Sequence, residues 1–401
     1  MHTRLRLGLV VATVAALLGA CSNPPAASQA PATTQASEAA SVAPAASQAL
    51  DYLSMTQDQL ATEAKKESEI VFSAWWGEEF WKEVANQFTK KYGVQARILL
   101  GNNAIDKILA EKDRQIGTID VQLIGGADVK TSIDAGLWYG PVLPEVQDHD
   151  KIDQKLAAVQ EGVQIGGYLV PIYRNQVGFL YDPDKVPNPP QTWDEFAAWV
   201  NANPKGFAYP DPNKGGSGQG FVQSVIASLT GGLDKYVGDT SVDPAKVANW
   251  NLAWDWLKAN NPKMNVTLSN SEDIDLLNQG AASIVSAWDD DSQAAIANGT
   301  LFKRAKMYIP KFGLPGGGDT AGVLKNAPDK AAGLLFLDFL TSPDIQQLMN
   351  KTVGSIPART DVTGIPSIIP EDVRASNGVR WMPAPYKALF TGDYTKNVLL
   401  Q

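Results

Sequence analysis

Cysteine and histidine are scarce in this chain of 401 residues, and the chain has no excess of positive charge. Cys21 is the only cysteine, which excludes an internal disulfide, thiol catalysis and a cysteine-ligated metal centre. The two histidines, His2 and His149, give little support to a histidine-ligated metal or a Ser-His-Asp hydrolase. Asp and Glu number 43 against 34 Lys and Arg, and this balance argues against nucleic-acid binding, which needs clustered positive charge.

Long uncharged apolar runs are also rare, and the one at the N-terminus is typical of a signal peptide. Arg4 and Arg6 precede the stretch Leu7 to Leu18, which is too short to span a bilayer as a mature helix. The stretch closes with Leu-Gly-Ala-Cys at residues 18–21, which resembles a bacterial lipobox. This resemblance implies that the Cys21 thiol carries a lipid such as palmitate. We predict a lipoprotein signal peptide over residues 1–21 and a protein anchored to the extracytoplasmic face of the cell membrane, at the cell surface or in the periplasm.

The next segment lacks aromatic residues altogether. From Ser22 to Ala49 the chain is almost wholly Ala, Ser, Pro, Gln and Thr, and Glu38 is its only charge. Such a composition cannot build a hydrophobic core. We therefore predict that residues 22–50 form a flexible tether, which would hold the folded part roughly 30 Å from the lipid by random-coil scaling.

The remaining residues, about 350, are enough for two ordinary domains. Short β-branched or aromatic runs alternate with amphipathic stretches, which indicates an α/β fold with parallel sheets. Capping boxes at Thr56 with Gln59 and at Thr192 with Glu195 predict helix starts. The predicted strands cover residues 69–75, 95–101, 120–126, 168–182, 281–288 and 305–313.

Residues 168–182 form an unusually long apolar run. The run is twice the usual strand length and has Pro171 near its start, so we predict one strand that leaves one sheet and enters another. Such a strand would act as a hinge. We predict that residues 305–313, with Pro310 and Gly313, are the returning hinge segment.

Four segments, in their order along the chain, resemble those of an extracellular solute-binding protein of a bacterial ABC importer. This large family includes maltose-, iron-, thiamine- and polyamine-binding proteins. The stretches ATEAKKESEIVFSAW (residues 61–75) and VPNPPQTWDEF (186–196) are similar to the family's opening and to the segment past its first crossover. LTSPDIQQLM (340–349) and GSIPAR (354–359) are similar to a late helix and turn. The resemblance implies a two-lobed periplasmic-binding-protein-like fold with a ligand cleft between lobes joined by crossover strands.

The resemblance also implies a domain plan and a set of partners. Residues 51–175 would form the first part of lobe 1, residues 176–307 lobe 2, and residues 308–401 the return to lobe 1 and the C-terminal helices. The expected partners are a small-molecule ligand, the permease of an ABC transporter and the membrane through the lipid anchor. We expect a monomer without cofactor or metal, and not an enzyme.

Candidate ligand contacts follow the predicted strands, because ligands of open parallel sheets bind beyond the carboxyl ends of the strands. A tryptophan beside glycine offers a flat wall for a sugar or a cation, and glycines let the backbone approach a ligand. The glycine-serine loop at residues 211–232 leads into a helix whose free amides favour an oxygen-rich or anionic group. We expect Asp128 to cap a helix instead. The predicted ligand-binding residues are Trp75, Trp76, Gly77, Gly126, Tyr173, Asn175, Ser217, Gln219, Trp288 and Asp289.

Three consecutive carboxylates, Asp289 to Asp291, follow Trp288. Adjacent carboxylates repel, so all three are not expected in one desolvated pocket. One of Asp290, Asp291 or Ser292 is expected to cap the helix that Gly299 ends. We expect Trp288 and Asp289 to face the cleft.

The ligand class stays open between a cationic organic solute, such as a polyamine or thiamine, and a sugar. Ferric iron is disfavoured, because the chain has no adjacent tyrosine pair and His149 is isolated. Two alternatives from other classes are a surface-anchored polysaccharide hydrolase and a structural lipoprotein. We predict no catalytic residues.

Overall fold

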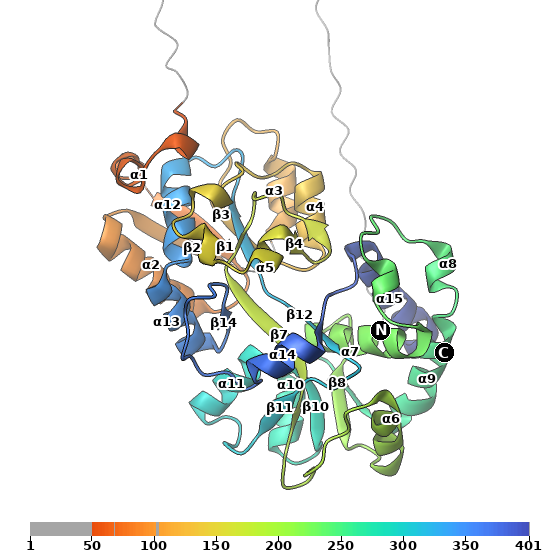
Figure 1. Cartoon of the computed structure of the whole chain (residues 1–401). Coiled ribbons are helices and arrows are strands. Elements are labelled where there is room, and N and C mark those ends of the chain that lie inside the picture. The colour runs from red at the N-terminus through yellow and green to blue at the C-terminus, as the bar shows by residue number, and fades with distance from the viewer. Residues whose placement is uncertain (1–49, 68, 102–103, 401) are drawn as a thin grey trace, which may run out of the picture. The chain divides into compact units, whose positions relative to one another are not determined.

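The computed structural model describes residues 50–67, 69–101 and 104–400, and the chain from Asp51 onward forms one compact unit (Figure 1). The predicted signal peptide, Cys21 and the tether up to residue 49 lie outside the described residues. Within the described part of the chain, no helix has both the length and the apolar character of a membrane span.

The first sheet has five strands in the order β2-β1-β3-β13-β6. Strand β1 pairs in parallel with β2 and β3, as the alternating pattern predicts, and β13 runs antiparallel to β3. The strands are β1 (Glu69–Ala74), β2 (Gln95–Leu100), β3 (Val121–Ile124), β6 (Val170–Pro171) and β13 (Thr320–Val323). A separate hairpin joins β4 (Val159–Gln160) and β5 (Val163–Gln164).

Helices cover this sheet and share one hydrophobic core with it, and we call this part the first lobe. Trp81, Val84 and Phe88 recur at spacings of three and four residues on one helix, and all three are buried. Trp81 packs edge-on against Phe72 of β1 with ring centroids 4.8 Å apart. The helices are α1 (Gln57–Ala64), α2 (Glu78–Tyr92), α3 (Ile105–Glu111), α4 (Asp128–Asp134), α5 (Gln154–Ala158), α12 (Lys330–Leu340) and α13 (Pro343–Val353).

The second sheet has the order β15-β12-β7-β10-β8-β9, and β11 and β14 also pair with β7. Parallel pairs join β10 to β8 and β8 to β9, whereas β7 runs antiparallel to β10. The strands are β7 (Tyr173–Tyr181), β8 (Phe207–Pro210), β9 (Asn265–Thr267), β10 (Ile284–Trp288), β11 (Lys306–Tyr308), β12 (Leu314–Gly317), β14 (Ile356–Pro357) and β15 (Gly378–Val379).

A second core fills this part of the molecule, which we call the second lobe. Phe179 of β7 stacks on Phe196 with ring centroids 5.2 Å apart, and Phe207 and Phe221 complete the aromatic cluster. The helices are α6 (Trp193–Ala202), α7 (Gly216–Thr230), α8 (Pro244–Val247), α9 (Asn251–Asn260), α10 (Asn270–Asn278), α11 (Asp289–Asn298), α14 (Glu371–Asn377) and α15 (Ala384–Tyr394). The mixed α/β, two-lobed architecture is confirmed, and so are the capping boxes at Thr56 and Thr192.

The chain passes between the lobes on neighbouring strands. As predicted, the run from residue 168 leaves the first sheet at β6 and enters the second at β7. The return lies at Gly318 and Asp319, between β12 and β13. The Ile172 backbone N–H donates to the Asp319 carbonyl at 2.9 Å, so the two crossovers are hydrogen-bonded to each other.

Two expectations about the later chain are wrong. Residues 305–313 are not the returning hinge, because β11 pairs with β7 inside the second sheet. The C-terminal part does not stay with the first lobe either. Ile369, Trp381 and Tyr386 belong to the second core, so the chain crosses a third time after β14. The aromatic side chains of this last segment hold it on the second lobe, because they pack into the second core.

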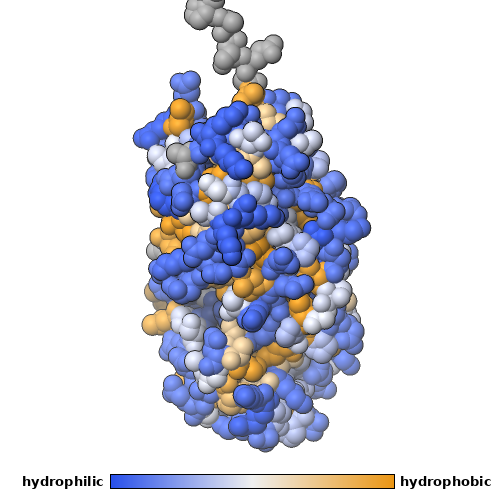
Figure 2. All heavy atoms as spheres, turned by 90° about the vertical axis from the view of Figure 1, so that its left-hand side faces the viewer, coloured by the Kyte–Doolittle hydropathy of each residue, from blue (hydrophilic) through white to orange (hydrophobic). Residues whose placement is uncertain are grey.

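The surface carries mostly polar side chains on the face that includes α2 and α11. Figure 2 shows hydrophilic residues over much of this face, with apolar residues exposed between them. Singly exposed apolar side chains are normal on soluble domains.

Candidate ligand-binding site

A cavity of about 550 Å³ lies between the two lobes. Ends of strands supply its walls: Trp75 follows β1, Gly126 follows β3, and Trp288 ends β10. This is the position that open α/β sheets give to their ligands. The lining residues are Trp75, Gly125, Gly126, Ala127, Asp128, Glu161, Tyr173, Asn175, Gly216, Gln219, Trp288, Gly318, Asp319, Trp381 and Lys387.

Three indole rings line the cavity. Trp75 comes from the first lobe, and Trp288 and Trp381 come from the second, with their ring centroids 6.2 Å apart. Gly216, at the start of α7, permits this arrangement because a Cβ there would lie 2.9 Å from the Trp288 ring. Such rings offer flat apolar faces that also attract cations.

The charges in the cavity are mainly negative. Asp128, Glu161 and Asp319 supply carboxylates, and Lys387 supplies the single ammonium among the lining residues. Lys387 Nζ lies 3.0 Å from Glu161 Oε2, so this pair neutralises itself. Two carboxylates, those of Asp128 and Asp319, are left to set the charge that a ligand meets.

Asp319 lies on the returning crossover. The Tyr173 hydroxyl donates to the Asp319 carboxylate, which connects the two crossovers through their side chains as well. Burial raises the pKa of Asp319 to about 7, and Glu161 adds to the shift while Lys387 opposes it. Gly125 is required for this geometry, since a Cβ there would overlap the Asp319 carboxylate. Asp319 is therefore a group that changes charge near neutral pH.

Asp128 differs from the other cavity carboxylates because it has no hydrogen-bond or ion-pair partner among the described residues. It is the first residue of α4, but the helix has no side-chain cap, so the expectation that Asp128 caps it is wrong. Burial raises the pKa of Asp128, and the nearby Asp106 adds to this shift. A half-buried carboxylate without a partner is a position at which a cation would be stabilised.

The structure divides the predicted ligand-binding residues into two groups. Those that line the cavity are Trp75, Gly126, Tyr173, Asn175, Gln219 and Trp288. Trp76 instead packs against Tyr173 and Phe80, with ring centroids 5.4 Å and 6.2 Å away. Gly77 is the left-handed residue that precedes α2 and lies outside the lining. The sequence could not separate Trp75 from Trp76, because both follow the same strand.

Ser217 does not face the cavity. It is fully buried, and its hydroxyl is within hydrogen-bond distance of Asn270 Oδ1 (2.9 Å) and the Ser286 carbonyl (3.1 Å). The Asn270 side chain also accepts from the Ser217 amide at 3.2 Å. The start of α7 is therefore used for internal packing, and the expected anion position there is not supported.

Asp289 is also turned away from the cavity. Its carboxylate accepts from the Gln176 amide at 2.7 Å and from Arg374 Nη2 at 2.8 Å, and only 2% of the side chain is exposed. The expectation that Asp289 faces a ligand is therefore wrong. Asp290 and Asp291 do not line the cavity either, and burial with the charges of Asp291 and Asp289 raises the pKa of Asp290 well above its ordinary value.

The predicted set lacks all four charged lining residues, Asp128, Glu161, Asp319 and Lys387, and it also lacks Trp381. Asp319 had a usable signal, because it directly follows three glycines, and Asp128 follows a glycine pair and one alanine. Trp381 and Lys387 had none, since they come from the C-terminal segment that was expected in the other lobe. Glu161 sits in a two-residue hairpin turn that no sequence pattern brings to the cleft.

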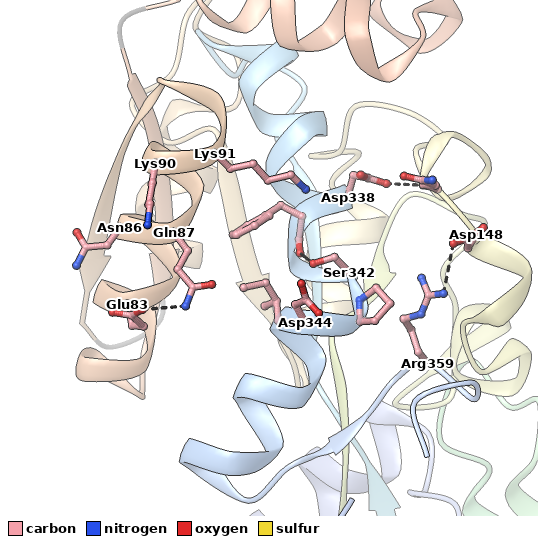
Figure 3. A pocket seen from close by; sticks show the side chains of 14 residues that line it. Glu83, Asn86, Gln87, Lys90, Lys91, Asp148, Asp338, Ser342, Asp344 and Arg359 are labelled. Carbon is pink, nitrogen blue, oxygen red and sulfur yellow. Dashed lines mark hydrogen bonds and ion pairs between the residues drawn. The ribbon is translucent and has the colours of Figure 1, made fainter. Parts of the chain in front are cut away.

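A second hollow, of about 930 Å³, lies within the first lobe between α2 and the start of α13 (Figure 3). Among its charged lining residues, Arg359 and Asp148 form an ion pair, whereas Lys90 and Asp344 have no ion pair among the described residues. Arg359 Nη2 lies 2.7 Å from Asp361 Oδ2 and 3.4 Å from Asp148 Oδ2, and Asp338 accepts from the Gln147 amide at 2.7 Å. We place the candidate site in the cavity between the lobes, because residues of both lobes and the ends of several strands line it.

Comparison with known proteins decides the family. The model of the bacterial extracellular solute-binding proteins matches residues 83–373, which is most of the chain. The chain belongs to this family. A curated relative, protein YnjB of Escherichia coli, is 23% identical over 306 residues, which cover 72% of this chain and 78% of YnjB. This protein is thus an extracellular solute-binding protein.

Solved structures share the fold at low sequence identity. AfuA of Actinobacillus pleuropneumoniae, with fructose-6-phosphate bound, has a TM-score of 0.60 at 16% identity and covers 84% of this chain and all of its own (100%). The spermidine/putrescine-binding protein PotD of Streptococcus pneumoniae has a TM-score of 0.59 at 15% identity, with 83% and 98% covered. Iron-bound HitA of Pseudomonas aeruginosa has a TM-score of 0.60 at 17% identity, with 83% and 100% covered. The ligands named for these proteins differ in chemistry, so the shared fold does not identify the ligand of this protein.

Proposed function

We propose that this solute-binding protein captures a small cationic organic solute in the cavity between its lobes. The observation that carries the proposal is the carboxylate of Asp128, which has no hydrogen-bond or ion-pair partner among the described residues. Indole faces surround the same space, and a carboxylate beside an aromatic wall suits an ammonium group. Asp319 adds a second negative charge when it is ionised.

A sugar is the second candidate ligand. The same three indoles could stack on sugar rings, and Asn175 and Gln219 could hydrogen-bond hydroxyl groups. A neutral sugar would leave the Asp128 charge uncompensated, however, and this favours the cation. The two ligands therefore differ in their dependence on that charge.

Capture works through closure of the lobes. The ligand touches Trp75 and Asp128 from the first lobe and Trp288 and Trp381 from the second, and it can contact all four only when the lobes are together. Contacts available only in the closed state shift the equilibrium toward closure. The closed form would then be the one presented to the permease.

Titration calorimetry of the purified protein tests the ligand class. The panel contains choline, thiamine, putrescine and spermidine as cations, maltose and glucose as sugars, and fructose phosphate as an anion. The proposal expects saturable binding of a cation, with much weaker binding in Asp128→Asn. Saturable binding of a sugar that Asp128→Asn leaves unchanged would establish the second candidate instead.

We further propose that a lipid on Cys21 anchors the protein, as the lipobox resemblance implies. Labelled palmitate should be incorporated into the wild-type chain in cells and not into Cys21→Ala. The variant should also leave the membrane fraction while keeping the same ligand affinity. Equal incorporation in both chains would contradict the anchor at this position.

A further inference from the structure

One end of the cavity already holds a cation that belongs to the protein. Lys387, on α15 of the second lobe, places Nζ 3.0 Å from Glu161 Oε2 and 3.8 Å from the centroid of the Trp381 ring. The side chains of Lys387 and Glu161 are only 11% and 7% exposed. An ammonium between a carboxylate and an indole face is the arrangement that a cationic ligand would use.

The two halves of this arrangement come from different lobes. Glu161 lies in the turn of the β4–β5 hairpin, which belongs to the first lobe, and Trp381 is part of the second core. Gly162 brings the turn against the second lobe, because a Cβ there would lie 2.8 Å from Pro383 Cα. The position of the Lys387 ammonium, between Glu161 and Trp381, is thus enclosed when the lobes are together.

The cavity therefore has two positions suited to a cation, and only one of them is free. At the free position, Asp128 has no partner among the described residues, and the Trp75 indole lies in the same lining. At the other position, Lys387 compensates Glu161. A ligand that brought a second ammonium would meet the lysine charge at that end, where Glu161 is paired with Lys387 and the Asp319 carboxylate already accepts from the Tyr173 hydroxyl.

We propose that Lys387 is a specificity residue, a tethered cation that restricts the ligand to a single positive charge. The inference rests on the proposed function, because it assumes that the cavity receives cations. It places the protein's ligands among small monocations and excludes diamines and polyamines. Removing the Lys387 ammonium should open the second position without touching Asp128.

The substitution Lys387→Met tests this directly, since it keeps the length of the side chain and removes the charge. We would titrate wild type and variant with matched pairs, butylamine against putrescine and pentylamine against cadaverine, which differ by one ammonium. The ratio of diamine to monoamine affinity is the readout. If the substitution weakened closure of the lobes, the affinities for the monoamine and the diamine would fall together, and their ratio would not change.

In Lys387→Met we expect the ratio to rise on the order of tenfold or more for at least one pair, because a charge-assisted hydrogen bond becomes available to the second ammonium. The double variant Glu161→Gln with Lys387→Met should abolish this gain, and Lys387→Arg should keep the wild-type preference. Thermal melting of each variant shows that it is folded.

An unchanged or reduced ratio in folded Lys387→Met would overturn the inference, and so would a gain that survives in the double variant. Failure of the proposed function looks different. It would appear as a wild-type protein that binds a sugar or an anion but no cation. A wild type that binds monocations and diamines equally well would overturn this inference alone.

Discussion

Arg374 Nη2 donates to Asp289 Oδ2 at 2.8 Å, and both side chains are shielded from solvent. The pair connects the start of α11 to α14, and the same carboxylate binds the Gln176 amide of β7. Burial raises the pKa of Asp289, and the Arg374 charge opposes the shift. The Asp289 carboxylate thus orients the strand end that carries Trp288, although Asp289 itself is not among the residues that line the cavity.

Removing one partner of this pair should destabilise the protein strongly. Arg374→Leu would leave the Asp289 carboxylate buried without its counter-charge, and such losses cost roughly 3–5 kcal/mol of unfolding free energy. Urea denaturation would measure the change. Asp372→Asn is the matched control on the same helix, because Asp372 is exposed and has no ion pair among the described residues, so its variant should unfold nearly like the wild type. Equal stabilities of Arg374→Leu and wild type would contradict the structural role.

Asp128→Asn should weaken binding of a cation without loss of stability. The change removes a charge but keeps the shape of the side chain, and a hydrogen bond to a charged group contributes roughly 1.5–3 kcal/mol, or about ten- to a hundredfold in Kd. Calorimetry gives the affinity. Asp106→Asn serves as control, because this exposed carboxylate lies near Asp128 but outside the cavity lining. Similar losses of affinity in both variants would show that the negative charge of this region as a whole, and not a direct contact with Asp128, attracts the cation.

Trp75→Ala should reduce affinity by about 0.5–2 kcal/mol, the usual contribution of a cation above an indole. Trp75→Phe should recover part of the loss, because it restores a smaller aromatic face. Tryptophan fluorescence should respond to ligand in the wild type, and the response should shrink in Trp75→Ala. A variant without Trp75 that binds as tightly as the wild type would remove this ring from the site.

Cation affinity should rise as pH increases through about 7, because the Asp319 carboxyl, whose pKa is raised to about 7, loses its proton in this range. The same titration lowers the free energy of unfolding as pH rises. A raised pKa means that the folded state holds a proton that the unfolded state has released, so this group contributes stability below its ordinary pKa of 3.8 and loses it as pH rises to about 7. Glu161, Lys387 and the Tyr173 hydroxyl face the same carboxylate.

Calorimetry at roughly pH 6 and roughly pH 8, in buffers of different ionisation enthalpy, would count the protons released on binding. Asp319→Asn should flatten the pH dependence. Asp128, whose pKa is also raised, stays present in that variant, so a pH dependence that persists there would assign the titration to Asp128 instead.

Patterns within a single segment of the sequence predict those features of the fold that depend on neighbouring residues alone. The capping boxes of Thr56 and Thr192 and the burial of Trp81, Val84 and Phe88 follow from spacing along a single helix. The entry of residues 168–182 into a second sheet also follows from the length of the run and its proline. These features need no knowledge of distant contacts.

The cavity was predicted less completely, because its charges are brought together by long-range packing. Glu161 and Lys387 are 226 residues apart in the sequence. Asp289 looked like a ligand contact because it follows a strand, but its partner Arg374 comes from a segment that was expected in the other lobe. Whether a carboxylate pairs with a side chain of the protein or remains available for a ligand depends on its neighbours in the tertiary structure.

Thermal melting of wild type and Asp128→Asn with choline, and with its uncharged carbon isostere dimethylbutanol, tests whether the Asp128 carboxylate binds a cation. A ligand that binds only the folded state raises the melting midpoint. We expect choline, and not its neutral isostere, to raise the melting midpoint of the wild type, and Asp128→Asn to lose most of this shift. Equal shifts by both compounds, or a cation shift that survives in Asp128→Asn, would contradict this expectation.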